Sequence, residues 1–174
     1  LQFIKEKKDK GKEHVGLFLK KGLLDEASHI ISDKIRIGQI LSNLLGNAIK
    51  FTEKGSIEFG YTINNNKWIE FYIRDTGIGI PAEKGKLIFE RFRQIDETTA
   101  RTYGGTGLGL SISKGIVDLM KGKIWFESEI GVGTVFYFTV PYNPLKNVQQ
   151  TETVKLVSAD ENHSLEGYEV LVVE

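Results

Sequence analysis

Residues 33–51 read DKIRIGQILSNLLGNAIKF and form the most strongly patterned stretch of the chain. Their apolar side chains recur at the spacing of one face of an α-helix. Asp33, at the start, is of a residue type that caps helix N-termini. The members of the apolar face are Ile37, Ile40, Leu41, Leu44, Leu45, Ala48 and Ile49. The stretch therefore predicts an amphipathic helix that lays one wide face on a core.

Two segments after this helix alternate between apolar and polar residues, as strands with one buried face do. They cover residues 57–63 and 69–73, and Asn64 to Asn66 between them predict a hairpin turn. Further strands are expected at 14–19, 28–32, 123–129 and 134–142, a short helix at 81–89 and a second amphipathic helix at 107–120. This order predicts an α+β fold, with a mixed sheet and helices on one face.

The composition is that of an ordinary globular domain and excludes several kinds of site. The 174 residues carry 23 basic and 23 acidic side chains, so a general nucleic-acid or anionic-membrane surface is not expected. There is no cysteine, which excludes disulfides and thiolate metal sites. No apolar run approaches the roughly 20 residues of a membrane span.

The chain divides into four parts by its composition and periodicity. Residues 1–14 are rich in lysine and glutamate and predict a solvated connector from an upstream helical region. Residues 15–142 form the main domain. Residues 143–165 are polar and without periodicity, as linkers are. Residues 166–174 end in GYEVLVVE, which predicts one buried strand.

Asn43, Asn47 and Lys50 stand on one face of the predicted helix, at i, i+4 and i+7. Two carboxamides and an ammonium facing one way could hold a metal ion and phosphate oxygens. Magnesium accepts oxygen ligands and keeps most of its waters, so one asparagine oxygen can suffice beside nucleotide phosphates. A solvent-exposed polar stripe explains the same pattern, and this helix alone favours that reading.

Two glycine-containing segments add further candidates. Residues 75–80 read DTGIGI, in which an aspartate at a strand end is followed by glycines that let backbone approach a flat ligand. A plain turn fits equally, and an aspartic protease would need a second such aspartate. Residues 104–110 read GGTGLGL directly before a helix, a setting suited to anions. This loop matches neither a dinucleotide fingerprint nor a P-loop.

Five motifs together resemble the catalytic domain of histidine kinases, in the ATPase superfamily that includes gyrase and HSP90. They are NLLGNAIKFTEKG at 43–55, DTGIGIP at 75–81, IFERFRQ at 88–94, GGTGLGL at 104–110 and GVGTVF at 131–136. The resemblance spans residues 33–141. It implies a Bergerat-type two-layer α/β sandwich that binds ATP and Mg²⁺.

The resemblance also implies roles for individual residues. Asn47 would be the magnesium ligand, Asn43 would support the phosphate region and Lys50 would contact phosphate. Asp75 would accept from the adenine amine, with Thr134 backing it through water. The other nucleotide-binding positions implied are Gly77, Gly79, Ile80, Arg101, Tyr103, Gly105, Thr106, Gly107, Leu108 and Gly109.

Phe89 and Phe92 match the phenylalanine-containing motif that, in the family, pins the base of a mobile lid. The lid would be residues 93–106, whose polar composition leaves little to bury. The simpler explanation is that both phenylalanines pack in the core, and we expect this to be partly true. Closure of the lid over ATP would exclude water and position the γ-phosphate.

Asn43 also bears on the reaction. Hydrolytic relatives carry a glutamate at this position to activate water, and an asparagine cannot act as a base at neutral pH. Transfer to a histidine is therefore expected, with no residue assigned as base. Of His14, His29 and His163, only His29 follows a serine, and its strand-like surroundings do not suit an acceptor. The acceptor is expected on an upstream helical hairpin, absent here, that also forms the dimer.

The expected function is thus that of the ATP-binding catalytic domain of a sensor histidine kinase, as part of a phosphorelay. Residues 166–174 resemble the first strand of a response-regulator receiver, and the alternative is a C-terminal strand added to this domain. With a receiver, the parent would be a homodimeric hybrid kinase that is cytoplasmic in this part, with an inner-membrane anchor as an option. The fragment is expected to be monomeric and inactive without its acceptor domain. A nucleotide-sensing or docking module without catalysis, and a hydrolase of the gyrase or HSP90 type, are the alternatives.

Overall fold

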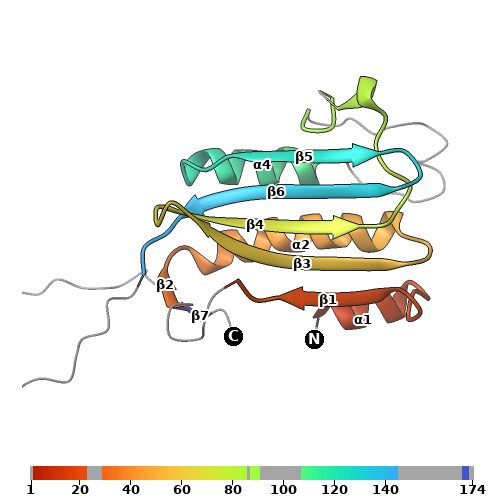
Figure 1. Cartoon of the computed structure of the whole chain (residues 1–174), viewed down its shortest axis with the longest axis horizontal. Coiled ribbons are helices and arrows are strands. Elements are labelled where there is room, and N and C mark those ends of the chain that lie inside the picture. Colours follow the sequence, from red (N-terminus) through yellow and green to blue (C-terminus); the bar gives the residue numbers. More distant parts are fainter. Residues whose placement is uncertain (1, 23–28, 86, 91–106, 145–169, 173–174) are drawn as a thin grey trace, which may run out of the picture.

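A mixed five-stranded sheet forms the centre of the computed structural model (Figure 1). The structure describes residues 2–22, 29–85, 87–90, 107–144 and 170–172. The strands are β1 (Gly16–Lys20), β3 (Ser56–Asn64), β4 (Trp68–Asp75), β5 (Ile124–Glu129) and β6 (Gly133–Pro141). Their order in the sheet is β1-β3-β4-β6-β5. Strand β1 is parallel to β3 and the other pairs are antiparallel, which confirms the mixed sheet.

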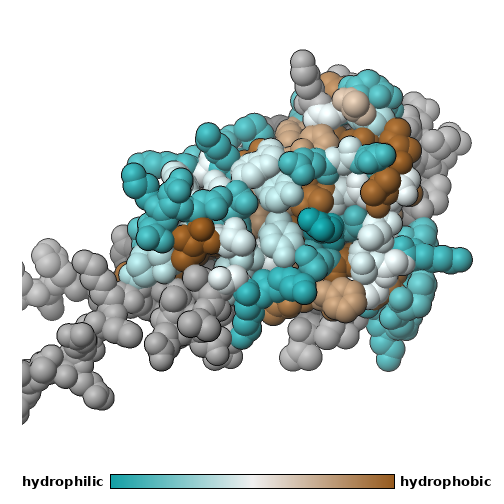
Figure 2. Space-filling model, viewed as in Figure 1, coloured by the Kyte–Doolittle hydropathy of each residue, from teal (hydrophilic) through white to brown (hydrophobic). Residues whose placement is uncertain are grey.

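Helices cover one face of this sheet (Figure 1). Within the described residues they are α1 (Gln2–Asp9), α2 (Lys34–Phe51) and α4 (Gly109–Leu119). Helix α2 packs on α4 and on β4, and α4 packs on β6. The predicted two-layer α+β architecture is therefore confirmed. Figure 2 shows the opposite face of the sheet, where hydrophilic and intermediate residues cover most of the surface.

Helix α2 forms as its sequence predicts. Its N-cap is Asp33, whose Oδ1 accepts from the backbone N of Arg36 at 2.9 Å. The buried side chains of the helix repeat at helical spacing and are Ile37, Ile40, Leu44, Leu45, Ala48 and Ile49. Burying an isoleucine or leucine side chain contributes roughly 1.5–3 kcal/mol, so the large side chains of this face fix the helix on the sheet. The opposite side of α2 is left for polar residues.

The register of the antiparallel strands fixes the position of the polar residues at their ends. Phe71 and Phe138 stack within the core with ring centroids 4.8 Å apart. Every second residue of a strand lies on the same face of the sheet, so the pair Asp75 and Thr134, at the end of β4, lies on the same face as Phe71 and Phe138. The hairpin between β3 and β4 turns at Asn65 and Asn66, both with positive φ, as the run of asparagines predicts.

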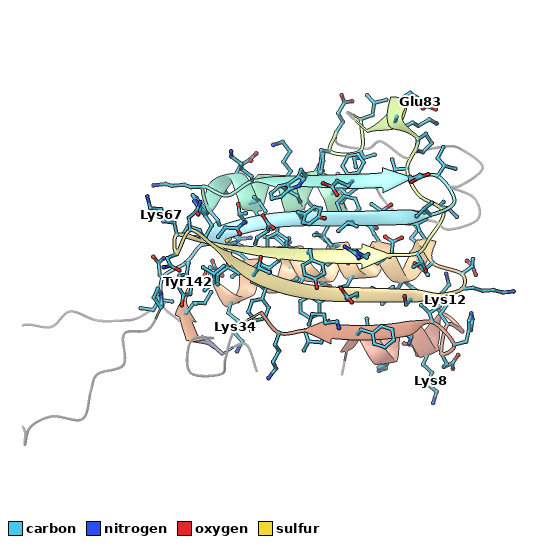
Figure 3. The ribbon with its side chains drawn as sticks, viewed as in Figure 1. Lys8, Lys12, Lys34, Lys67, Glu83 and Tyr142 are labelled. Carbon is cyan, nitrogen blue, oxygen red and sulfur yellow. The ribbon has the colours of Figure 1, made fainter. Side chains whose placement is uncertain are left out.

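Lys12 departs from the prediction of a wholly solvated connector. Its side chain is 10% exposed, and Nζ donates to the backbone oxygens of Lys50 at 2.9 Å and Thr52 at 3.0 Å (Figure 3). It also pairs with Glu53 at 3.0 Å. These carbonyls end helix α2, where unpaired oxygens and the helix dipole attract a cation. The sequence of a charged segment does not show which of its lysines meets a helix end.

Three further segments differ from the expectation in extent. The helix predicted at 81–89 is a short 3-10 helix, η2 (Ala82–Lys84), followed by turns. Gly85 ends it, in keeping with the low helix propensity of glycine. Strand β2 (His29–Ile31) lies outside the main sheet and pairs antiparallel with β7 (Val170–Val172). The tail therefore contains the predicted strand, while its assignment to a receiver stays a prediction.

His29 lies in β2, in agreement with strand-like rather than helical surroundings. Among the residues that the structure describes, no helix is both long enough and apolar enough to cross a bilayer.

Candidate functional site

The polar face of α2 holds three of the predicted site residues. Asn43 is half-buried, and its Nδ2 donates to the backbone O of Gly109 at 3.1 Å and to Oγ of Ser113 at 3.2 Å. Both donor hydrogens of this amide are therefore committed to helix α4. One turn further along, Asn47 is also half-buried, and its amide makes no hydrogen bond within the described part of the chain. The two carboxamides thus differ: Asn43 holds two helices together, whereas no described residue competes with a ligand for the amide of Asn47.

Lys50 follows on the same helix, near its C-terminal end. Its Nζ lies 4.7 Å from the centroid of the Phe51 ring. Burial, with a smaller contribution from the positive charge of Lys10, lowers the pKa of the Lys50 ammonium. A partly desolvated ammonium gains more from a nearby anion than one in bulk water does. Its position is compatible with the phosphate contact predicted for it.

Asp75 ends strand β4 as a buried carboxylate, only 8% exposed. Its Oδ1 accepts from the backbone N of Gly77 at 2.8 Å. Burial raises the pKa of Asp75, and backbone hydrogen bonds from Gly77 and Thr134 act in the opposite direction. In the described residues the partners of this carboxylate are backbone N–H groups and not a cation. Such a carboxylate is poised to accept hydrogen bonds from a ligand.

The glycines after Asp75 are required by close packing on two sides. A Cβ on Gly77 would lie 2.6 Å from the backbone O of Phe51, at the end of α2. Gly79 has φ +74, and a Cβ there would lie 2.2 Å from the backbone O of Glu129. The loop is therefore held between α2 and the β5–β6 turn, where Gly131 N also donates to Ile78 O at 2.9 Å.

Replacing Gly79 by alanine is expected to destabilise the domain by about 2–4 kcal/mol, because it combines a left-handed backbone with an overlap on a carbonyl. Thermal unfolding should show a midpoint roughly 8–16 °C lower. The control is Gly38→Ala on α2, where an added Cβ meets nothing within 4 Å. That variant should be as stable as the parent, or more so by up to about 1 kcal/mol. A Gly79→Ala midpoint within about 2 °C of the parent, far below the expected shift, would show that the loop is not packed as described.

Helix α4 begins at the end of the predicted glycine box. Gly107 has φ +67, and the N-cap Leu108 makes no side-chain capping bond. Ile112 N donates to Leu108 O at 2.9 Å, which starts the helical ladder. The amides before Ile112 in this first turn have no intrahelical partner, so they and the helix dipole favour an anion. The structure therefore supports an anion-binding end at α4.

Phe89 is partly buried and packs against the hydrophobic core. Its ring centroid is 6.2 Å from that of Phe126 and 6.5 Å from that of Phe136. This packing accords with the simpler explanation of a core phenylalanine. Phe92, the whole predicted lid at 93–106, and the candidates Arg101, Tyr103, Gly105 and Thr106 lie outside the described residues.

Helix α2 connects the parts of the site that are described. Through Asn43 it is bonded to the start of α4, and through Phe51 it touches the Gly77 loop. Asn47 lies between these two contacts on the same helix. The structure thus places the amide face of α2 between an anion-binding helix end and a buried acceptor carboxylate.

Two serines that the sequence did not single out belong to this arrangement. Ser113 is fully buried and accepts from Asn43. Ser128 on β5 accepts from the backbone N of Ile80 at 2.8 Å and contacts Thr134 Oγ1 at 2.8 Å. The signal for Ser128 was its position: it has the same strand parity as Phe126, so it points into the core, where a hydroxyl needs partners.

The family model described as histidine kinase-, DNA gyrase B-, and HSP90-like ATPase matches residues 32–144. The chain belongs to this family. Its relatives include the signal transduction histidine-protein kinase BarA of Escherichia coli (strain K12), which is 45% identical over 120 residues, 67% of this chain. Since those residues are 13% of BarA, the chain matches only a small part of its relative.

Solved structures agree with the assignment. Full-length ShkA in complex with AMPPNP is 30% identical, with a TM-score of 0.68 over 83% of this chain and 29% of that protein. The catalytic domain of the histidine kinase ThkA is 31% identical, with a TM-score of 0.66 over 82% of this chain and 91% of that domain. The chain is thus an ATP-binding catalytic domain of the histidine kinase type, and the Bergerat-type fold expected from the resemblance is confirmed.

Proposed function

We propose that this domain binds Mg-ATP and transfers the γ-phosphoryl group to a histidine on a separate helical-hairpin domain of the same protein. The observation that carries the proposal is the side-chain chemistry of Asn43 and its hydrogen bonds to α4. A residue that must activate water needs a basic atom, and a carboxamide has none at neutral pH. The NH₂ group of Asn43 instead donates to Gly109 O and Ser113 Oγ and so holds α2 to α4. Transfer to an external nucleophile requires no such base, because positioning and electrostatics supply most of the catalysis.

The adenine and the phosphates would be held by different elements. Asp75 would accept from the exocyclic amine of adenine, backed by Thr134, with Gly77, Gly79 and Ile80 forming the wall beside the base. Gly107, Leu108 and Gly109 would place the first amides of α4 at the phosphates, with Lys50 contributing positive charge. The buried carboxylate and the uncapped helix end support this division. The residues of 101–106 would complete the site from the lid.

Asn47 suits a magnesium ion that is shared with nucleotide phosphates. Its amide makes no hydrogen bond within the described residues, so its oxygen is available. The described part of the chain contains no group of three His, Cys, Asp or Glu side chains able to hold a metal. A carboxamide oxygen together with phosphates and waters is a donor set that magnesium accepts. When bound, the ion would neutralise charge on the transferring group.

The proposed partners are ATP, the histidine-bearing hairpin and a response-regulator receiver. We assign residues 1–14 to a connector, 15–142 to the catalytic domain, 143–165 to a linker and 166–174 to the start of a receiver. The parent would be a homodimer with this domain in the cytoplasm, and no nucleic-acid partner is proposed. The balanced charge of the chain supports the last point.

Supplying an acceptor hairpin in trans tests this function. With Mg-[γ-³²P]ATP, label should appear on the hairpin and disappear when its histidine is replaced by alanine, while phosphate release by the domain alone stays close to background. Steady phosphate release that is lost in Asn47→Ala, without transfer, would instead support a hydrolase. Calorimetry that finds no binding at millimolar nucleotide would support a docking module.

A further inference from the structure

Ser128 joins three parts of the site through a single hydroxyl. It lies half-buried on β5, and its Oγ is 2.8 Å from the backbone N of Ile80 and 3.0 Å from the backbone O of Gly133. The third contact is with Thr134 Oγ1 at 2.8 Å. Ile80 belongs to the loop after Asp75, and Thr134 pairs with Asp75 in the sheet. The hydroxyl therefore contacts both elements that flank the buried carboxylate.

The chemistry of these partners decides the direction of each hydrogen bond. A carbonyl oxygen can only accept, so the one hydrogen of Ser128 goes to Gly133. The N–H of Ile80 can only donate, so it occupies one lone pair of Ser128. The contact with Thr134 can then form only if Thr134 donates its hydrogen to the second lone pair. All the bonding capacity of Ser128 is used.

This arrangement leaves the Thr134 hydroxyl without a hydrogen for a ligand. Its hydrogen is directed to Ser128, so the hydroxyl can offer only lone pairs to any further partner. The Asp75 carboxylate itself accepts from Gly77 and from Thr134 backbone groups, and when ionised it can only accept. Side by side in the register Asp75↔Thr134, the two residues present acceptors only.

We propose that Ser128 is a specificity-determining positioning residue, which fixes the Thr134 hydroxyl as an acceptor and so favours purines with a 6-amino group over purines with a 6-keto group. The proposal deepens the proposed function, because it rests on a purine nucleotide lying at Asp75. A 6-amino group offers hydrogens to the acceptors, whereas a 6-keto oxygen faces them with lone pairs. Buried acceptors without a donor discriminate strongly against the wrong ligand.

The test compares ATP with inosine triphosphate, which carries a 6-keto group, by calorimetry in the presence of Mg²⁺. In Ser128→Ala, the Thr134 hydroxyl loses its acceptor and can turn its hydrogen to a keto oxygen. The ratio of the Kd for inosine triphosphate to the Kd for ATP should therefore fall at least about fivefold, the worth of one neutral hydrogen bond. Ser128→Thr keeps the hydroxyl and should hold the ratio within about twofold of the parent.

Thr139→Ala is the matched control. The Oγ1 of Thr139 accepts from the backbone N of Lys123 at 2.9 Å. The variant therefore removes a hydroxyl from the β5–β6 pair at the end opposite Ser128. The Kd ratio should not change. Should Ser128→Ala unfold, Ser128→Cys retains the size with a weaker acceptor, and its ratio should lie between those of the alanine variant and the parent.

A ratio unchanged in Ser128→Ala and Ser128→Cys, or equal weakening of both nucleotides, would overturn the assignment, because a purely structural serine moves both affinities together. These results would leave the proposed function intact if the parent binds ATP. A parent domain that binds neither nucleotide would overturn the proposed function and this inference together.

Discussion

Asp75→Asn should bind Mg-ATP about 10–150-fold more weakly than the parent domain. The loss corresponds to about 1.5–3 kcal/mol, the usual worth of a hydrogen bond to a charged group. Asparagine also places an NH₂ group where the adenine amine requires an acceptor. Isothermal titration calorimetry at neutral pH measures the change directly.

The same substitution should not destabilise the unliganded domain at pH 7. Burial raises the pKa of Asp75 in the folded state above that in the unfolded chain. The folded state therefore holds the proton more tightly, and stability falls as pH rises from the unfolded pKa through the folded one. At pH values above the folded pKa, the buried carboxylate is charged and lowers the free energy of unfolding. A neutral asparagine at this position has no such charge. Thermal unfolding at pH 7 should show a midpoint no lower than that of the parent.

Asp118→Asn is the matched control for both measurements. Asp118 is an exposed carboxylate on α4 that pairs with Lys114 at 3.1 Å, so its loss should change ATP affinity by less than about twofold. Because the pKa of Asp75 is raised, the ATP affinity of the parent should begin to fall at a higher pH than it would with an aspartate of ordinary pKa. Unchanged ATP affinity in Asp75→Asn would remove Asp75 from the site.

Asn47→Ala should abolish phosphotransfer to an added acceptor hairpin, by at least roughly 100-fold in rate. The variant removes the only protein oxygen that we assign to the metal, and the metal supplies several kcal/mol of charge stabilisation in such reactions. Nucleotide affinity should separate into two parts. The part that depends on Mg²⁺ should disappear, while binding in the presence of EDTA should stay near that of the parent.

Gln39→Ala removes a carboxamide from the same helix two turns earlier. Gln39 is exposed and accepts only a long bond of 3.4 Å from Arg36 within the described residues. Transfer by this control should stay within about twofold of the parent, because the side chain touches neither α4 nor the Gly77 loop. Persistent transfer in Asn47→Ala would contradict the metal assignment and direct attention to another residue on α2.

Patterned segments made most of the fold predictable. The apolar face of α2, the alternation of β3 and β4, and the asparagine turn each encode their structure locally. Their order then leaves few ways to build a two-layer sandwich. The candidate residues Asn47 and Asp75 could be placed in the fold for a related reason, since they lie on the regular elements α2 and β4.

Features that depend on contacts between distant residues were not predictable. Lys12 caps α2 from 38 and 40 positions away in sequence, and nothing local distinguishes it from the neighbouring lysines. The pairing of β2 with β7 joins segments separated by most of the chain. Ser128 was missed because its role depends on one hydroxyl meeting Ile80, Gly133 and Thr134 at once.

A crystal structure of the domain with Mg²⁺ and AMPPNP tests the central claim most directly. The exocyclic amine of adenine should lie within hydrogen-bond distance of the Asp75 carboxylate, with the phosphates between Asn47 and the first turn of α4. Side chains packed tightly into the space between Asn47 and Asp75, with the nucleotide bound elsewhere or absent, would contradict the account.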